Sequence, residues 1–141
     1  MGLDVEGSEV LRSKAAPPVI LLDTHALLWL DRSHPRSRLL ARWAGRLYVS
    51  PASLLEVELL TEVGRVRLRR GASPATLALD SRWLVDSPAS AAWFEEAWAV
   101  PWARDPFDRL IVAHARHRGW RLATADAALL ESLGDTGAVA L

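Results

Sequence analysis

The sequence predicts an α/β fold with a mostly parallel central sheet and helices on both of its faces. Short apolar runs typical of buried strands alternate along the chain with longer segments that carry helix signals. Several helix segments begin with a cap residue followed by proline, as at Ser50, Ser73, Ser87 and Asp105. Because parallel strands need a crossover connection, this alternation favours right-handed strand–helix–strand units.

Length and composition indicate a single globular domain. The chain has 141 residues, half of them apolar, with zero formal charge and no cysteine. The lack of cysteine excludes disulfides, thiolate zinc sites and cysteine nucleophiles. No apolar run is long enough to span a membrane, and the first residues are acidic rather than typical of a signal peptide. We therefore expect a soluble, cytoplasmic protein without a membrane partner.

The first half of the chain predicts two strands and three helices. Residues 1–18 are polar and lack a hydrophobic period, so we expect a disordered leader ahead of a domain spanning 19–141. The apolar run at 19–22 predicts a strand buried on both faces. It ends at Asp23. The elements expected after it are helices over 24–30, 36–44 and 51–63 and a strand over 47–49.

The second half predicts three further strands, a short helix at Pro74 and three longer helices. Before them, residues 65–70 form the densest basic stretch of a chain with no net charge. A solvated loop is the favoured interpretation of that stretch, and a track for RNA is the alternative. The expected strands cover 82–85, 120–123 and 138–141, and the longer helices cover 88–100, 106–118 and 127–133.

Four acidic residues occupy similar places in this predicted fold. Asp23 follows the first strand, Glu56 lies early in the helix after the second, Asp108 lies in a first helical turn, and Asp126 follows a later strand. In a doubly wound sheet these places share the edge where the strands end, so the carboxylates can converge. A structural alternative exists for Asp23 as a helix cap and for Asp108 as the acid of a capping box with Asp105.

A cluster of carboxylates predicts a metal-dependent nuclease. Like charges held close together repel strongly unless protonation or a cation relieves the repulsion. Oxygen ligands without cysteine favour Mg²⁺ or Mn²⁺. One such ion, or a pair about 4 Å apart, activates water and stabilises the charge that develops during phosphodiester cleavage.

Four separated blocks resemble the PIN-domain family and, within it, the VapC toxins of bacterial toxin–antitoxin pairs. The blocks are LLDTHALLW at 21–29, VSPASLLEV at 49–57, RDPFDRLIVA at 104–113 and ATADAAL at 123–129. They occur in the order found in the family. The resemblance covers residues 19–141 and is loosest over 71–102.

The resemblance implies a three-layer α/β/α PIN domain with an acidic active site. It further implies an Mg²⁺- or Mn²⁺-dependent endoribonuclease that cleaves RNA, is often a homodimer, and is held inactive by a cognate antitoxin of the VapB type. The acids that match the family's catalytic and metal-binding positions are Asp23, Glu56, Asp108 and Asp126. We predict Asp23 and Asp108 as the main ligands, with Glu56 holding a metal-bound water or a second ion and Asp126 completing the shell.

Six further residues are candidates for supporting the four acids. Small hydroxyl residues match those that accompany the acids in the family, and an extra aspartate matches one in the third block, where a capping role is favoured. Two arginines flank the pocket and are candidate contacts for the scissile phosphate. The hydroxyl residues are Thr24, Ser53 and Thr124, the aspartate is Asp105, and the arginines are Arg104 and Arg109.

Other functions fit the sequence less well. A phosphate-binding glycine loop is absent, and Lys14 is the only lysine, so a receiver domain lacks its late lysine. A haloacid-dehalogenase-type phosphatase needs an aspartate where His25 stands. A PIN-like module that binds RNA or a partner without cleavage, or a PIN nuclease of RNA processing outside a toxin pair, stays open. The presence of all four acids favours an active enzyme.

Tryptophans suggest which faces of the domain are buried. We expect Trp29 and Trp120 in the core. Trp93, Trp98 and Trp102 lie at spacings of five and four, and they are candidates for a dimer or antitoxin interface, with core packing as the alternative.

Overall fold

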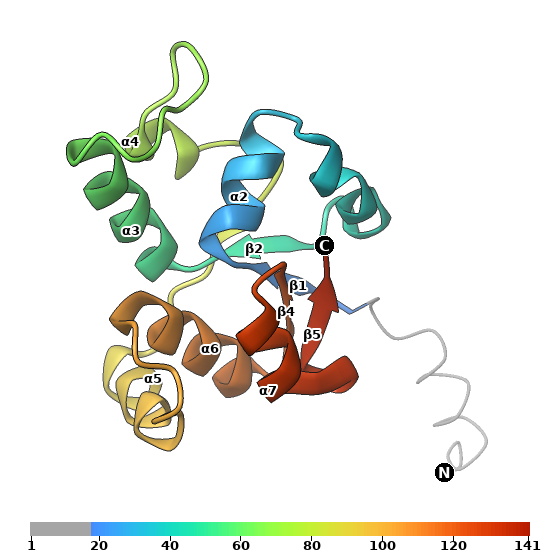
Figure 1. The fold of residues 1–141 in the computed structure, drawn as a ribbon, viewed down its shortest axis with the longest axis vertical. Helices are drawn as coiled ribbons and strands as arrows, with labels where there is room; N and C mark the ends of the chain where they lie inside the picture. The colour runs from blue at the N-terminus through green and yellow to red at the C-terminus, as the bar shows by residue number, and fades with distance from the viewer. Residues whose placement is uncertain (1–17) are drawn as a thin grey trace, which may run out of the picture.

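Five parallel strands form the central sheet of this computed structural model, which describes residues 18–141. Their order across the sheet is β3-β2-β1-β4-β5, which confirms the predicted parallel α/β arrangement (Figure 1). Apart from Pro18, the predicted leader lies outside the described residues. The strands are β1 Ile20–Leu22, β2 Leu47–Val49, β3 Leu84–Val85, β4 Arg121–Thr124 and β5 Ala138–Ala140.

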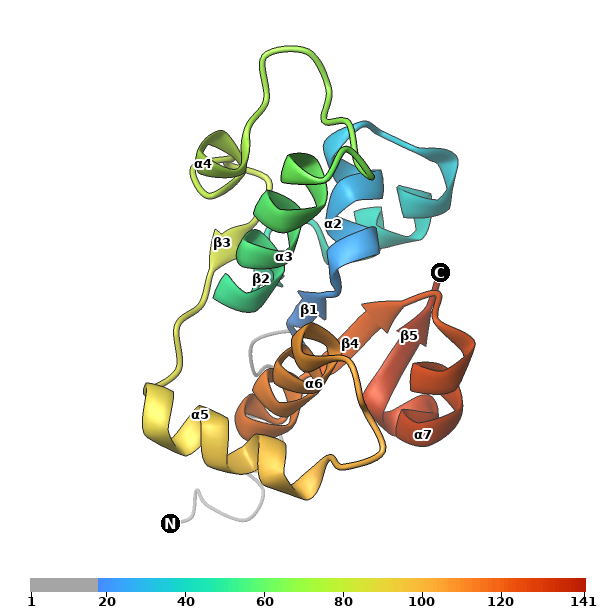
Figure 2. The same ribbon diagram turned by 60° about the vertical axis from the view of Figure 1, so that its left-hand side comes forward.

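Helices cover both faces of the sheet (Figures 1 and 2). In the described residues, no helix has both the length and the apolar character needed to cross a membrane. The α-helices are α2 Thr24–Asp31, α3 Pro51–Glu62, α4 Pro74–Leu77, α5 Ser90–Glu96, α6 Pro106–Arg118 and α7 Ala127–Gly137, and the 3₁₀ helices are η1 Pro35–Trp43 and η2 Ala97–Ala99.

Two hydrophobic clusters lie on opposite faces of the sheet. Side chains alternate along β1, so Ile20 and Leu22 join one cluster with α2, η1 and α3, whereas Leu21 joins the other with α5, α6 and α7. All three residues are fully buried. The apolar run predicted as a strand buried on both faces is therefore confirmed, and it places the residue after it, Asp23, at the end of the central strand.

Cap residues followed by proline begin three of the helices as predicted. The side chains of Ser50, Ser73 and Asp105 accept backbone N–H bonds at the starts of α3, α4 and α6. The prediction at Ser87 is wrong, because α5 begins at Ser90 without a side-chain cap. The helix predicted over 36–44 is present as the 3₁₀ helix η1, from Pro35 to Trp43.

The strand predicted over 82–85 is shorter in the structure. Only Leu84 and Val85 pair with β2, at the edge of the sheet. Trp83 is buried, and its ring N–H donates to the Leu77 carbonyl at 2.7 Å. Arg82, just before it, forms ion pairs with Asp80 and Asp31. The segment therefore packs through side chains before it joins the sheet.

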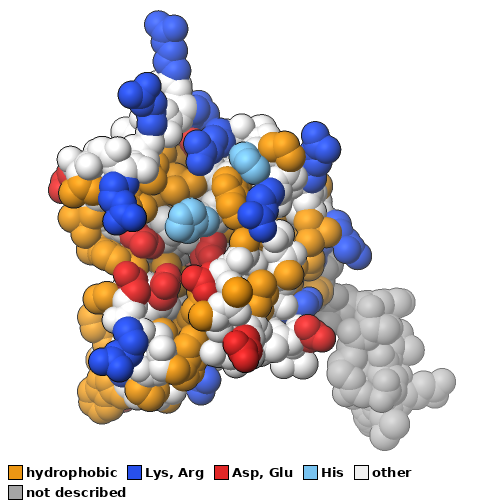
Figure 3. Space-filling model, in the orientation of Figure 1, with side chains coloured by type: hydrophobic (Ala, Val, Ile, Leu, Met, Phe, Trp, Pro, Cys, Tyr) orange, Lys and Arg blue, Asp and Glu red, His pale blue; other side chains and the backbone are white. Residues whose placement is uncertain are grey.

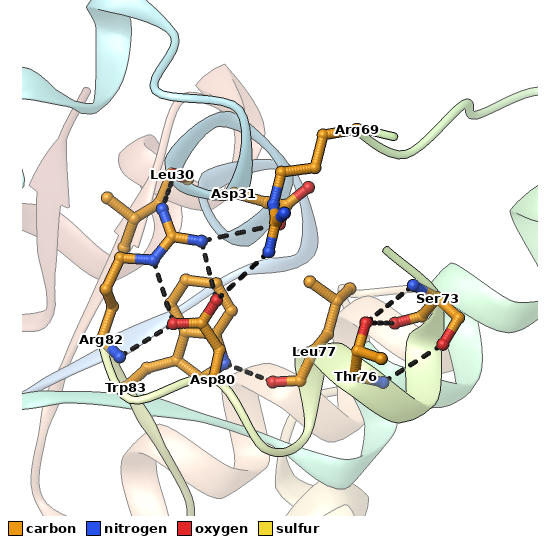
Figure 4. A network of polar contacts seen from close by, with 9 residues as sticks. All are labelled: Leu30, Asp31, Arg69, Ser73, Thr76, Leu77, Asp80, Arg82 and Trp83. Atoms are coloured by element: carbon orange, nitrogen blue, oxygen red, sulfur yellow. Dashed lines mark hydrogen bonds and ion pairs between the residues drawn. The ribbon is translucent and has the colours of Figure 1, made fainter. Parts of the chain in front are cut away.

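An ion-pair network fixes the long connection between α3 and β3 against α2 (Figure 4). The Asp31 side chain is 2% exposed and accepts from Arg69 Nε at 2.9 Å, and Arg82 Nη2 lies 3.6 Å from it. Arg82 also donates to Asp80 at 2.8 Å and to the Leu30 carbonyl. Because a buried carboxylate needs partners, these contacts hold the connection in place. Arg69, one member of the basic stretch, therefore has a structural role.

Candidate active site

A cleft of about 350 Å³ opens where the carboxyl ends of the central strands meet the starts of α2, α6 and α7. Figure 3 shows acidic side chains gathered in a hollow in the middle of this face, with a histidine at the rim and Lys or Arg side chains around it. All four predicted acids line the cleft. Its lining residues are Asp23, Thr24, His25, Trp29, Arg36, Glu56, Asp108, Ala125, Asp126 and Leu129.

Asp23 is held at the floor of the cleft by the sheet and by α2. Its N–H donates to the Ala123 carbonyl at 3.1 Å, which extends the pairing of β1 with β4. Its Oδ1 accepts from the Ala26 N–H at 2.8 Å, so Asp23 is also the cap of α2. Burial raises the pKa of this carboxyl group, and hydrogen bonds from Thr124 and Ala26 oppose that rise. Asp23 therefore both caps α2 and lines the cleft, two roles that were alternatives from the sequence.

Glu56 reaches the cleft from the second turn of α3. The Thr24 hydroxyl donates to Glu56 Oε1 at 2.5 Å, so a residue next to Asp23 orients a carboxylate from another helix. Burial raises the pKa of Glu56, and the nearby charge of Asp105 adds to the rise. One turn earlier, the buried Ser53 hydroxyl has no hydrogen-bond partner within the described part of the chain.

Asp108 carries a strongly perturbed carboxyl group. It lies in the first turn of α6, where Asp105 caps the helix by accepting from the N–H groups of Phe107 and Asp108 at 2.9 and 3.0 Å. Burial raises the pKa of Asp108 to about 7, and the charges of Asp105, Glu56, Asp126 and Asp23 contribute in that order. The acids therefore act on one another across the cleft.

Asp126 completes the acidic lining from the start of α7. Its Oδ1 accepts from the Ala128 and Leu129 N–H groups at 2.9 and 3.1 Å, which makes it the cap of that helix. Its own N–H donates to the Thr124 hydroxyl at 3.0 Å. Thr124 therefore connects two of the acids, because it also bonds Asp23.

Neither predicted arginine is among the described residues that line the cleft. Arg109 Nε donates to the Ala97 carbonyl at 2.8 Å, which ties α6 to η2 and gives this side chain a structural role. Arg104 is exposed and directly precedes Asp105. Contact of either arginine with the phosphate stays a prediction.

One wall of the cleft is made by residues that the sequence interpretation did not assign to it. Trp29, expected in the core, is only partly buried and lines the cleft with His25 and Arg36. Trp29 is contacted by Arg36 and His34 around η1 rather than enclosed in the core. The spacing of His25 and Trp29, four residues apart and directly after Asp23, is the signal that could have revealed it.

The donor set of the cleft fits a hard divalent cation. Four carboxylates face one cavity, and burial together with nearby negative charge disfavours the charged forms of Asp23, Glu56 and Asp108, a cost that a bound cation would remove. Within residues 18–141, however, no three His, Cys, Asp or Glu side chains are already arranged as a metal site. The acids thus line one cavity, but their side chains are not already in metal-coordinating positions.

We expect the metal-free protein to lose stability as the pH rises from about 4 to about 8. The ordinary pKa of Asp108 is 3.8, and its folded-state pKa is about 7, so over this interval the folded state binds more protons than the unfolded state. The protonated Asp108 side chain adds to the free energy of unfolding fully below pH 4, and this contribution is lost as the pH rises past 7. Urea unfolding in EDTA at a series of pH values measures this. Asp108→Asn should flatten the decline, whereas an equal decline in that variant would contradict the assignment.

The PIN domain family matches residues 20–133. A toxin–antitoxin complex from Klebsiella pneumoniae aligns at 20% identity and a TM-score of 0.60, over 85% of this chain and 95% of the other.

Two further solved structures are similar. VapBC2 from Rickettsia felis, bound to a DNA fragment from its promoter, aligns at 15% identity and a TM-score of 0.62, over 86% of this chain and 98% of the other. DNA-bound VapBC from Salmonella typhimurium aligns at 19% identity and a TM-score of 0.56, over 82% and 92%. No curated protein sequence gives a significant match. With its parallel sheet, its acidic cleft and a family match over most of its length, the chain belongs to the PIN-domain family.

Proposed function

We propose that this protein is a metal-dependent endoribonuclease that cleaves RNA phosphodiester bonds in the cytoplasm as the toxin of a type II toxin–antitoxin pair. The observation that carries the proposal is the convergence of Asp23, Glu56, Asp108 and Asp126 on one cleft, where the pKa of Asp108 is raised to about 7. Such mutual destabilisation is typical of functional sites, and oxygen donors of this kind suit Mg²⁺ or Mn²⁺.

Each acid has a distinct part in the proposed site. Asp23 and Asp108 would be the main ligands of the ion, and Glu56 and Asp126 would complete its environment. When bound, the ion supplies charge stabilisation and an activated water for attack on phosphorus. The Thr24 hydroxyl keeps the Glu56 carboxylate turned into the cleft, and Thr124 does the same for Asp23. These hydroxyl groups therefore act as positioning residues.

The toxin role is supported by the fold relatives and is separable from the nuclease role. One similar solved structure is a toxin–antitoxin complex and the two others are VapBC complexes with DNA, which supports a cognate antitoxin of the VapB type as partner. A PIN nuclease of RNA processing would share the cleft without such a partner. A short open reading frame next to this one favours the toxin, and its absence together with harmless expression in a bacterial host would favour RNA processing.

RNA cleavage tests the nuclease proposal directly. Purified protein is incubated with Mg²⁺ and a labelled single-stranded RNA of mixed sequence, and with the DNA of the same sequence. We expect internal cuts in the RNA. A protein that binds the RNA but leaves it intact under every divalent metal condition would instead fit the non-cleaving PIN-like module.

A homodimer is part of the proposal, and an exposed apolar ridge supports it. Phe94, Trp98 and Trp102 follow one another at spacings of four and are 51%, 74% and 40% exposed. Trp93, grouped with them from the sequence, instead lies in the core, where its ring N–H donates to the Leu110 carbonyl. Exposed aromatic side chains are enriched at protein interfaces, so these three residues are the ridge that we assign to the dimer.

Trp98→Ala is expected to shift the protein from dimer towards monomer in analytical ultracentrifugation. The reason is that truncating a tryptophan that acts as a hot spot at an interface costs about 2 kcal/mol or more, about a thirtyfold change in dissociation constant. Leu79→Ala is the matched control, since Leu79 is 86% exposed and lies away from the ridge. A dimer that survives Trp98→Ala unchanged would rule out this ridge as the interface.

A further inference from the structure

We propose that Trp29 and Arg36, together with His25, form a docking wall for one nucleotide of a single-stranded RNA beside the acids of the cleft. The inference rests on the proposed nuclease function and adds to it the residues that hold the substrate. It starts from an electrostatic problem. A cleft lined by four carboxylates repels the phosphates of RNA until a cation offsets their charge, so attractive side chains of the same cavity would add to the binding of the substrate.

The wall is a stack of rings and a planar cation. The guanidinium carbon of Arg36 lies 4.6 Å from the centroid of the Trp29 ring. The His34 ring stacks on Trp29 with centroids 5.6 Å apart and planes 24° from parallel, and the His25 ring lies 6.3 Å from Trp29 at 53°. Three of these side chains, His25, Trp29 and Arg36, also line the acidic cleft.

Two separate contacts hold Arg36 in this stack. Its Nη2 donates to the main-chain oxygen of Leu141 at 2.9 Å, just after β5. Its backbone N–H donates to His34 Nδ1 at 3.1 Å, at the cap of η1. Arg36 itself is exposed, and Trp29 is partly exposed. The docking wall is therefore preorganised, so binding of a nucleotide costs little side-chain conformational entropy.

The chemistry of this wall suits a nucleotide with an accessible base. Bases stack on aromatic rings and on arginine planes, and the guanidinium group also pairs with phosphate oxygens. A base inside a duplex is covered by its neighbours and cannot reach the wall. Stacking works with every base, so this subsite selects single strands rather than a sequence.

Variants of Arg36 and Trp29 test the wall by RNA affinity. Binding of a labelled 12-nucleotide single-stranded RNA, and of the same strand in a duplex, is measured with Mg²⁺ in an Asp23→Asn background that does not cleave. We expect Arg36→Ala to weaken single-strand binding about tenfold and to reduce the salt slope by about one. Trp29→Leu, which keeps bulk without a ring, should also weaken it about tenfold, and Trp29→Phe should weaken it less than threefold.

The control and the kinetic readout separate docking from a structural role. Arg38→Ala removes an exposed arginine of the same 3₁₀ helix that lies outside the cleft, and it should leave RNA affinity unchanged. With Asp23 restored, Arg36→Ala should raise KM about tenfold and change kcat less than threefold, because the acids are untouched. Thermal unfolding of Trp29→Leu checks its fold, and Arg36→Ala carries the test if that variant is unstable.

Each outcome decides one proposal. If the protein cleaves RNA but Arg36→Ala and Trp29→Leu bind it as tightly as the parent, the docking wall is wrong and the nuclease function stands. If Arg36→Ala and Trp29→Leu lose affinity equally for duplex and single-stranded RNA, the wall does not select single strands. If no variant ever cleaves RNA but the binding differences appear, the wall stands and the nuclease proposal fails.

Discussion

Replacing Asp108 by Asn is expected to reduce RNA cleavage about a thousandfold or more while leaving the protein folded and more stable at pH 8. The loss of cleavage follows because the variant removes a main ligand of the proposed ion, and a thousandfold corresponds to about 4 kcal/mol of transition-state stabilisation. The gain in stability follows because the pKa of Asp108 is about 7 in the folded protein, so its ionisation at pH 8 opposes folding. We expect about 1–3 kcal/mol, since the side chain keeps partial contact with water.

Asp23→Asn should lose cleavage to the same extent. Asparagine is as good a helix cap as aspartate, so the bond from the Ala26 N–H to residue 23 is expected to survive and keep α2 in place. Glu62→Gln is the matched control, because Glu62 is an exposed acid at the end of α3 and does not line the cleft. Initial cleavage rates at saturating metal and urea unfolding at pH 8 measure the two effects. Wild-type rates in either aspartate variant would refute the assignment of that residue.

Removal of divalent metal is expected to abolish cleavage, and Mg²⁺ or Mn²⁺ should restore it. The physical reason is that four carboxylates lining one cavity repel each other and the substrate until a cation offsets their charge. Binding to the folded state alone also stabilises it, by about 2.7 kcal/mol when the free metal is a hundred times its dissociation constant. The thermal unfolding midpoint should therefore rise with Mg²⁺, and this rise should be largest above pH 7.

The variants make the metal experiment specific. Asp23→Asn and Asp108→Asn should show a much smaller rise of the unfolding midpoint with Mg²⁺ than the wild type, whereas Glu62→Gln should match the wild type. Cleavage that persists in excess EDTA would contradict a metal-dependent mechanism. A midpoint that rises equally in all four proteins would place the bound metal outside the cleft.

Local chemistry explains which elements could be predicted from the sequence. The Ser50-Pro51 and Asp105-Pro106 pairs set helix starts through a side-chain acceptor and a residue without an N–H, and both effects act within a few residues. The bounds of η1 and of the edge strand β3 depend instead on contacts with residues that are distant in the sequence. Arg82, for instance, lies just before β3 and bonds the distant Leu30 carbonyl and Asp31.

The sequence by itself determined the alternation of strands and helices, the parallel sheet, and the four acids at its edge, because hydrophobic period, caps and strand ends are local properties. Only the tertiary structure decided how the charges of these acids affect one another and which other side chains line the same cleft. The pKa of Asp108 depends first on burial and then on nearby acids, including Glu56 from α3 and Asp126 from α7, and Arg36 of η1 lies over the Trp29 ring of α2 only in the folded chain. Burial and through-space charge depend on distances that residue order does not contain.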